Sequence, residues 1–143
     1  MLVFEKAIMK RYWPAEEKND QKESVRLVAL QIEVDLDNSN QVGELFNCMV
    51  RGLVEIAFMD TLTGEEYILP AITIKPFNVK QRTVKIGKGE DVESVKTEYA
   101  ALTLMGRLKD DQGSQVLADL YRFFNIPLQM TIADFKWEQS EKV

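Results

Sequence analysis

The sequence predicts an α+β fold that is mainly antiparallel β-sheet, barrel-like, with two helices and two pseudo-repeated ββαβ halves. Strand-like, helix-like and strand-like segments follow one another twice, at residues 25–59 and 99–135. Each unit leaves an apolar face that the other unit can bury, which favours one shared core. We therefore expect about six to eight strands in a single domain. The expected boundaries are 1–143 for the domain, about 1–62 and 63–137 for the halves, and 138–143 for a polar tail.

Alternation of apolar and polar residues, the pattern of a half-buried strand, is clearest between residues 25 and 36. Its apolar positions are Val28, Leu30, Ile32, Val34 and Leu36. Residues 2–13 are predicted as a strand that ends at Pro14, because proline cannot donate a hydrogen bond to a sheet. The polar stretch 15–24 is predicted as a solvated loop, and Pro70 predicts an edge or a bulge. Further strands are expected at 53–59, 67–69, 83–86, 99–108 and 126–135.

Two segments carry the periodicity of an amphipathic helix. Their apolar stripes are Val42, Leu45, Phe46 and Met49 in the first, and Leu117, Leu120, Tyr121 and Phe124 in the second. Asn38 or Ser39 is expected to cap the first helix, and Gly52 to end it in the left-handed conformation. Asn125 is expected to end the second helix in the same way. The only long helices are therefore predicted at 38–51 and 111–124, packed on a shared sheet.

Length and composition indicate an ordinary globular chain. The 143 residues are 45% hydrophobic, and no apolar run approaches the roughly 20 residues of a transmembrane helix. The first residues lack a basic segment followed by a long apolar core, so no signal peptide is expected. The lone Cys48 cannot form an internal disulfide and is interpreted as a small core residue. Together these observations predict a cytoplasmic protein.

The chain contains no histidine. That absence removes the commonest general base and the commonest transition-metal ligand, and it excludes catalytic triads that depend on histidine. A structural zinc site is also excluded, because one cysteine cannot supply the usual ligands. We therefore predict that the protein is not an enzyme and uses no cofactor or metal.

Carboxylates at the ends of predicted strands are the first candidates for chemistry. They are Asp35, Asp37, Asp60, Asp110 and Asp111. Such carboxylates could hold Mg²⁺ for phosphoryl chemistry. Acidic and amide side chains at strand-to-helix junctions also cap helices by accepting hydrogen bonds from free backbone amides. Both units carry these residues, as capping requires, whereas catalysis needs only one site. We interpret them as caps.

A basic stretch is the second candidate. Its cations and its aromatic residue are Lys75, Lys80, Arg82, Lys85, Lys88 and Phe77. Proteins that bind single-stranded nucleic acid use this combination, because cations follow the phosphates and rings stack on bases. The alternative is an exposed edge strand that lysines protect against aggregation. The chain's net charge of −5 disfavours non-specific affinity for nucleic acid and favours the edge strand.

Two pairs of neighbouring aromatic residues are the third candidate. Tyr12 and Trp13 lie on a predicted strand, where adjacent side chains point to opposite faces. One of the two is expected in the core, and the other could serve as a binding platform or a dimer contact. Phe123 and Phe124 leave the same question open at the second helix.

The first strand–helix–strand unit resembles short proteins of unknown function from bacteriophage and prophage genomes. The resembling segments are residues 30–37, 44–46 and 54–56, with echoes at 102–104, 119–121 and 128–130. The resemblance covers about half of the chain and contains no functional motif. It implies a small cytoplasmic accessory protein.

We therefore predict a non-catalytic binding or interaction protein, such as a phage or prophage accessory protein, that does not act at a membrane. Its partner is expected to be another protein or a second copy of itself in a homodimer. The alternative is a single-stranded nucleic-acid-binding protein that uses residues 75–88. A carboxylate-dependent metal enzyme ranks last. The candidate binding residues are Lys75, Phe77, Lys80, Arg82, Lys85, Lys88, Tyr12 and Trp13.

Overall fold

The computed structural model describes residues 2–18, 21, 24–107 and 113–135. Within these residues the elements are β1 (Leu2–Lys18), β2 (Ser24–Asp35), α1 (Asn40–Arg51), β3 (Leu53–Asp60), β4 (Glu66–Ile74), β5 (Asn78–Ile86), a 3-10 turn (Gly89–Asp91), β6 (Glu93–Arg107), α2 (Gly113–Tyr121) and β7 (Leu128–Asp134). The predicted α+β class, with a mainly antiparallel sheet and two helices, is confirmed.

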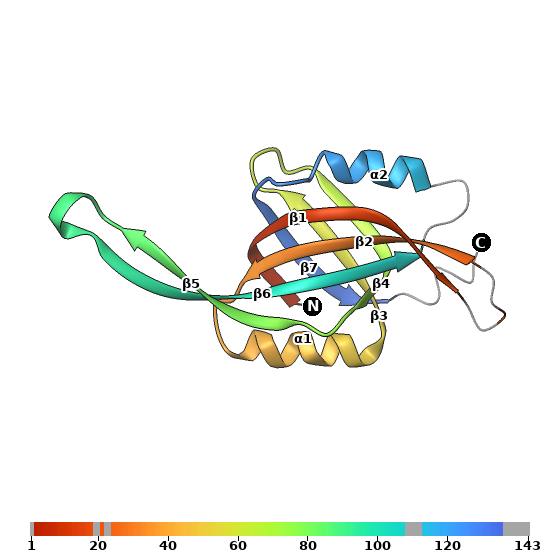
Figure 1. Cartoon of the computed structure of the whole chain (residues 1–143), viewed down its shortest axis with the longest axis horizontal. Coiled ribbons are helices and arrows are strands. Elements are labelled where there is room, and N and C mark those ends of the chain that lie inside the picture. The colour runs from red at the N-terminus through yellow and green to blue at the C-terminus, as the bar shows by residue number, and fades with distance from the viewer. Residues whose placement is uncertain (1, 19–20, 22–23, 108–112, 136–143) are drawn as a thin grey trace.

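Six of the strands form a closed ring of antiparallel pairs (Figure 1). Their order is β2-β1-β7-β3-β4-β6, and β6 pairs again with β2 through residues 99–107. β5 lies outside the ring, because β6 is its sole partner strand in the described part of the chain. The outer side of β5 is therefore an exposed edge of this sheet.

The order of the ring is unchanged when β1, β2 and β3 are exchanged with β4, β6 and β7. Two ββαβ halves related by a two-fold rotation would have this property. The pseudo-repeat, its halves at 1–62 and 63–137 and the description of the ring as a barrel nevertheless stay predictions. The predicted tail at 138–143 lies outside the described residues.

The core fills the inside of the ring. Alternate residues of each ring strand point inward, as Val54, Ile56 and Phe58 do on β3, and these side chains are almost fully buried. The alternation predicted for β2 is borne out in the same way by Val28, Leu30, Ile32 and Val34. Burying one such side chain stabilises the fold by about 1.5–3 kcal/mol.

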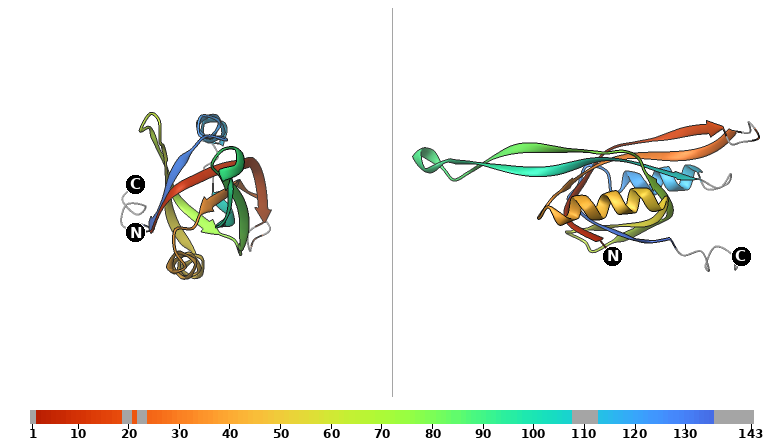
Figure 2. Two further views of the ribbon diagram at one scale, coloured as in Figure 1. Left: turned by 90° about the vertical axis from the view of Figure 1, so that its left-hand side faces the viewer. Right: turned by 90° about the horizontal axis from the view of Figure 1, so that it is seen from below.

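The two helices lie on opposite sides of the ring (Figures 1 and 2). α1 contributes Leu45 and Cys48 to the core, and α2 with the turn after it contributes Leu120 and Phe123. Each helix therefore reaches the same apolar interior from its own side. Neither helix in the described residues is both long and apolar enough to cross a membrane.

The buried face of α1 differs from the predicted apolar stripe. Gln41, Leu45 and Cys48 are its buried residues, whereas Phe46 is 54% exposed. The prediction counted apolar residues only, so it could not include a buried glutamine. The predicted end of the helix is correct, because Gly52 follows it with φ of 94°.

Gln41 makes side-chain hydrogen bonds at the start of α1, but they do not cap the helix as the sequence predicted for Asn38 or Ser39. Its Oε1 accepts hydrogen bonds from the backbone N–H groups of Asp37, at 2.6 Å, and Asn38, at 3.4 Å. Its Nε2 donates to the carbonyl oxygen of Val3 at 3.2 Å. Ser39 occupies the N-cap position but makes no side-chain capping bond. Gln41 therefore holds the segment that enters α1 and ties α1 to β1.

The predicted stripe of the second helix is correct for Leu117 and Leu120, which pack in or against the core, but not for Tyr121 and Phe124, because α2 ends early. α2 stops at Tyr121, which is 71% exposed, and the chain turns before Phe123 and Phe124. Phe123 is 1% exposed and Phe124 is 37% exposed, so the buried positions are Leu120 and Phe123. Asn125 has the predicted left-handed conformation, with φ of 58°, but it lies four residues after the end of α2 and so does not end this helix.

Prolines do not end the strands as simply as predicted. β1 continues past Pro14 to Lys18, so the predicted strand end and the first part of the predicted loop at 15–24 are wrong. β1 pairs with β7 only as far as Ala7, so Pro14 has a partner strand on one side, where proline is tolerated. Pro70 lies within β4 beside a register shift against β3, which agrees with the predicted bulge.

Candidate functional site

A two-stranded hairpin projects away from the ring (Figures 1 and 2). We term residues 78–98 the β5–β6 arm. β5 pairs with β6 along its whole length. β6 pairs with β2 only from Tyr99 onward, so residues 93–98 have β5 as their one neighbouring strand within the described residues. Both edges of the arm are therefore unpaired beyond its base.

The arm presents apolar side chains to solvent. Every residue from Thr83 to Lys96 is exposed. Five large hydrophobic residues of the arm are 37–57% exposed: Val79, Val84, Ile86, Val92 and Val95. Val84 and Val95 are register partners, so they share one face with Ile86. An isolated two-stranded hairpin is at best marginally stable in water, so the arm depends on contacts at its base.

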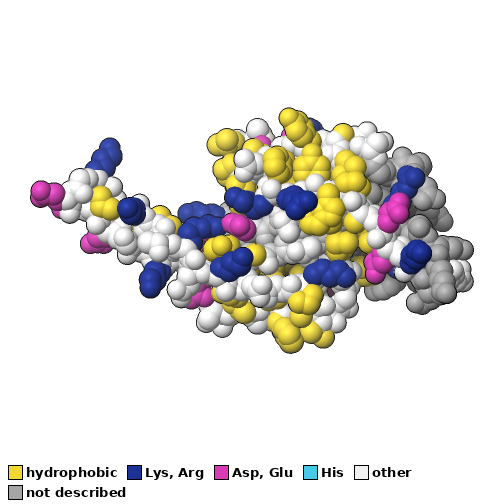
Figure 3. All heavy atoms as spheres, in the orientation of Figure 1, with side chains coloured by type: hydrophobic (Ala, Val, Ile, Leu, Met, Phe, Trp, Pro, Cys, Tyr) yellow, Lys and Arg dark blue, Asp and Glu magenta, His cyan; other side chains and the backbone are white. Residues whose placement is uncertain are grey.

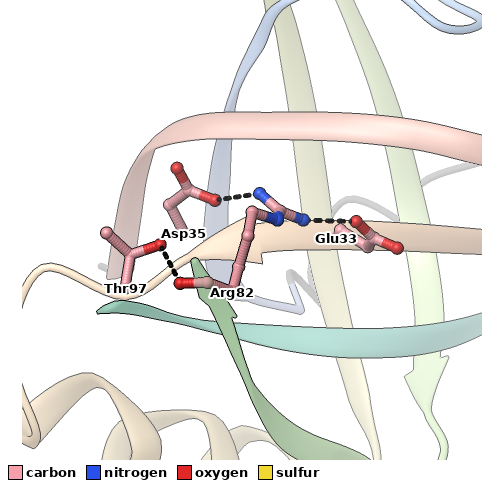
Figure 4. Close-up of polar contacts among 4 residues, drawn as sticks. All are labelled: Glu33, Asp35, Arg82 and Thr97. Carbon is pink, nitrogen blue, oxygen red and sulfur yellow. Dashed lines mark hydrogen bonds and ion pairs between the residues drawn. The ribbon is translucent and has the colours of Figure 1, made fainter. Parts of the chain in front are cut away.

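Arg82 provides those contacts (Figure 4). Its guanidinium donates hydrogen bonds to Oε1 of Glu33 at 2.6 Å and to Oδ1 of Asp35 at 3.3 Å. The same group lies 4.2 Å from the centre of the Tyr99 ring. Its backbone oxygen accepts a hydrogen bond from Oγ1 of Thr97 at 3.5 Å. Because guanidinium–carboxylate bonds are directional, these contacts hold the arm in one orientation relative to β2.

The position of Asp35 corrects its interpretation as a helix cap. Asp35 ends β2 and pairs with Arg82 on the outer face of the sheet. Asp60 likewise accepts a hydrogen bond in a hairpin turn, from the N–H of Leu62 at 2.9 Å. The predicted caps at 110–111 lie outside the described residues. No group of three acidic or cysteine side chains in the described residues is close enough together to hold a metal ion.

The predicted basic residues differ in their surroundings. Lys75, Lys80, Lys85 and Lys88 are exposed. Arg82 is already paired with two carboxylates. Phe77 is half-buried and packs against the core, so its ring has a structural contact rather than a free face for a base.

Pairing with β6 also brings acidic residues to the arm. They are Glu90, Asp91, Glu93 and Glu98. The arm thus contains five cationic and four acidic residues, and Figure 3 shows both kinds along it. The sequence has no carboxylate between Ala71 and Gly89, but in the structure the paired strand β6 places carboxylates beside this stretch.

The aromatic candidates are both engaged by neighbours. Tyr12 packs against the core and meets the ring of Phe124 edge-on, with 5.6 Å between the centroids. Trp13 is half-buried, and the guanidinium of Arg11 lies 4.9 Å from its ring centre. Both side chains are half-buried, whereas the sequence predicted one in the core and the other exposed.

A hollow of about 190 Å³ lies beside α1 and β7. It is lined by residues that include Cys48, Arg51 and Asp134, and the last two form an ion pair. Burial raises the pKa of the Cys48 thiol, and the nearby Arg51 only partly opposes this effect. The thiol is therefore protonated at neutral pH and is a poor nucleophile.

Sequence reasoning did not single out Glu33 and Tyr99, the partners of Arg82. A signal existed, because Glu33 and Asp35 lie two residues apart and therefore share the polar face of one strand. Nothing in the pattern says which cation faces them, since Arg82 is 47 and 49 residues away along the chain.

Comparison with protein-family models, curated proteins and solved structures finds no significant match for this chain. The resemblance to small phage and prophage proteins therefore stays a prediction. The arm and the outer surface of the ring are the features that bear on function.

Replacing Arg82 with glutamine is expected to loosen the arm without unfolding the ring. The ion pairs are partly exposed and so contribute about 1 kcal/mol, which corresponds to roughly fivefold faster exchange of amides 84–95. Hydrogen exchange followed by mass spectrometry measures this change. Arg122→Gln is the matched control, because Arg122 forms exposed ion pairs with Glu65 and Asp119 away from the arm. Equal arm exchange in both variants would show that Arg82 does not anchor the arm.

Proposed function

We propose that this protein is a non-catalytic, cytoplasmic binding protein that contacts a protein partner through the β5–β6 arm. The observation that carries the proposal is a hairpin with exposed apolar side chains, held in a fixed direction by Arg82. Ordering such a hairpin costs conformational entropy, and its unpaired edges favour aggregation. A partner that covers the apolar face would offset both costs.

The lack of catalysis is part of the proposal. It is supported by the absence of histidine from the chain. The engagement of Asp35 by Arg82 and the raised pKa of the buried Cys48 thiol support it as well. These groups are the ones that a carboxylate-dependent or thiol-dependent mechanism would need free.

Single-strand nucleic-acid binding is the second candidate. Lys80, Lys85 and Lys88 favour it, because they are exposed and form no ion pair within the described residues. Two observations weigh against nucleic-acid binding. The carboxylates of β6 would repel phosphates, and Arg82 already forms ion pairs with Glu33 and Asp35.

Photo-cross-linking tests the proposal. Ile86 is replaced with benzoylphenylalanine, and the full chain is irradiated alone and in cell extract. We expect discrete protein adducts, identified by mass spectrometry, because Ile86 lies on the apolar face of the arm. The same probe at Val50, an exposed residue of α1, is the matched control. Adducts that are no more frequent at Ile86 than at Val50 would contradict the proposal, and an oligonucleotide adduct would favour the second candidate.

A further inference from the structure

The outward face of β7, β3 and β4 carries a shallow hollow of about 290 Å³. We term it the acidic groove, and its lining includes Glu55, Ala57, Met59, Glu66, Gln129 and Thr131. Strand register explains its shape. Ala57 pairs with Thr131 on one side and with Ile68 on the other. Glu55, Ala57 and Met59 point outward on β3, and the small side chain of Ala57 leaves a depression between the other two.

The chemistry of the acidic groove is negative at its sides and apolar at its floor. Glu55 and Glu66 form no ion pair within the described residues. Gln129 donates a hydrogen bond to Glu5 of the neighbouring strand at 2.8 Å, which places a third carboxylate beside the groove. Ile68, next to Ala57 in the register, is 51% exposed. The surface therefore suits a ligand that is both cationic and apolar.

The β5–β6 arm has that complementary chemistry. Lys80, Arg82, Val84 and Ile86 alternate along β5 and so lie on one face, and Lys88 follows in the turn. Glu93, the register partner of Ile86, lies on the same face, and Arg82 is paired with carboxylates of β2. The arm has a net charge of +1, whereas the whole chain has −5, which leaves −6 for the rest. The arm is thus the less negative part of a strongly acidic molecule. Electrostatic repulsion between two copies is therefore weakest when the arm of one copy makes the contact.

We propose that the arm of one copy docks in the acidic groove of a second copy. Ile86 and Val84 would cover Ala57 and Ile68, while the lysines of the arm meet the groove carboxylates. This inference rests on the proposed function, because it names a second copy as the partner of the arm. The arm points away from its own ring, so the contact forms between molecules (Figure 2). Such a head-to-tail contact leads to a closed ring of subunits or to a filament.

Edge-to-edge pairing of arms is the main competing contact. Within the described residues, the ring leaves two strand segments unpaired on one side: β1 beyond its pairing with β7, and β4 before its pairing with β6. In-register parallel pairing of β5 with β5 of another copy would bring Lys80, Arg82 and Lys85 against the same cations, which disfavours that arrangement. Docking in the groove avoids this repulsion.

Reciprocal charge reversal tests the docking. One variant combines Lys80→Glu with Lys88→Glu, a second combines Glu55→Lys with Glu66→Lys, and the third carries all four changes. Self-association is measured by sedimentation velocity and light scattering over a concentration series at low and high salt. We expect the wild-type chain to associate, each double variant to associate at least about tenfold more weakly, and the fourfold variant to regain association. Added salt should weaken the wild-type contact.

Lys10→Glu with Lys18→Glu is the matched control, because both lysines are exposed on β1 and the charge change is the same. Circular dichroism verifies that every variant is folded. A shortened arm, in which Asn-Gly joins the register partners Thr83 and Lys96 in place of residues 84–95, should abolish association.

A wild-type chain that stays monomeric would refute the docking, and so would wild-type association that groove reversal leaves unchanged. If the chain is monomeric but Ile86 cross-links to another protein, only the choice of partner fails. If Ile86 also gives no adduct above the control, the proposed function fails too.

Discussion

Replacing Phe123 with alanine is expected to lower the free energy of unfolding by about 3–5 kcal/mol. Phe123 is 1% exposed, and its ring stacks on Tyr67 with 5.8 Å between the centroids. The deletion therefore opens a cavity at the place where the turn after α2 meets the core. Phe124→Ala is the matched control, because Phe124 is 37% exposed and its main aromatic contact is Tyr12. That change should cost only about 1–2 kcal/mol. Urea denaturation of both variants measures the difference.

The pKa of Tyr67 gives a second measurement of the Phe123 substitution. Burial raises the pKa of the Tyr67 hydroxyl, with a smaller contribution from Asp119. Removing the Phe123 ring admits water, so the pKa of Tyr67 should move back toward the ordinary tyrosine value of about 10. Ultraviolet absorbance follows this titration, and Tyr67→Phe identifies its share of the signal. Equal losses of stability in the two phenylalanine variants would contradict the burial difference on which the prediction depends.

The elements of the fold were largely predictable, because their signals are local. A period of two residues identified β2, and glycine after a periodic segment identified the end of α1. The buried faces of the helices were not predictable in the same way. Gln41 is buried because it is hydrogen-bonded to Val3, 38 residues away, and no local pattern contains that contact.

The candidate site shows the same division. The basic segment near Lys80 and Lys85 was identifiable, and its alternative interpretation as an exposed edge strand agrees with the position of β5. The net charge around this segment was not predictable, because the carboxylates that offset its cations come from β2 and β6. Glu33 reaches Arg82 only after β5 and β2 are placed on either side of β6. Strand order, which is set by the packing of the whole ring, therefore decides which charges are free to bind a partner.

Replacing Gln41 with alanine is expected to lower the free energy of unfolding by about 2–3 kcal/mol. The change leaves the N–H groups of Asp37 and Asn38 and the carbonyl of Val3 without their side-chain partner, and all three hydrogen bonds are partly buried. Chemical denaturation measures the loss. Ser39→Ala is the matched control, because Ser39 holds the N-cap position without a capping bond, so its removal should cost at most about 0.5 kcal/mol.

Gln41→Glu separates the two directions of hydrogen bonding. The introduced carboxylate can still accept from Asp37 and Asn38, but at neutral pH it faces the carbonyl oxygen of Val3 with no proton to donate. Its pKa should therefore be raised in the folded state above the unfolded value of about 4.3. The deficit relative to wild type should be absent below that unfolded value and should appear as the pH rises through the folded pKa. Denaturation of both proteins over a pH series measures it. A deficit that does not change with pH would mean that Gln41 stabilises α1 by accepting hydrogen bonds alone and does not tie the helix to β1.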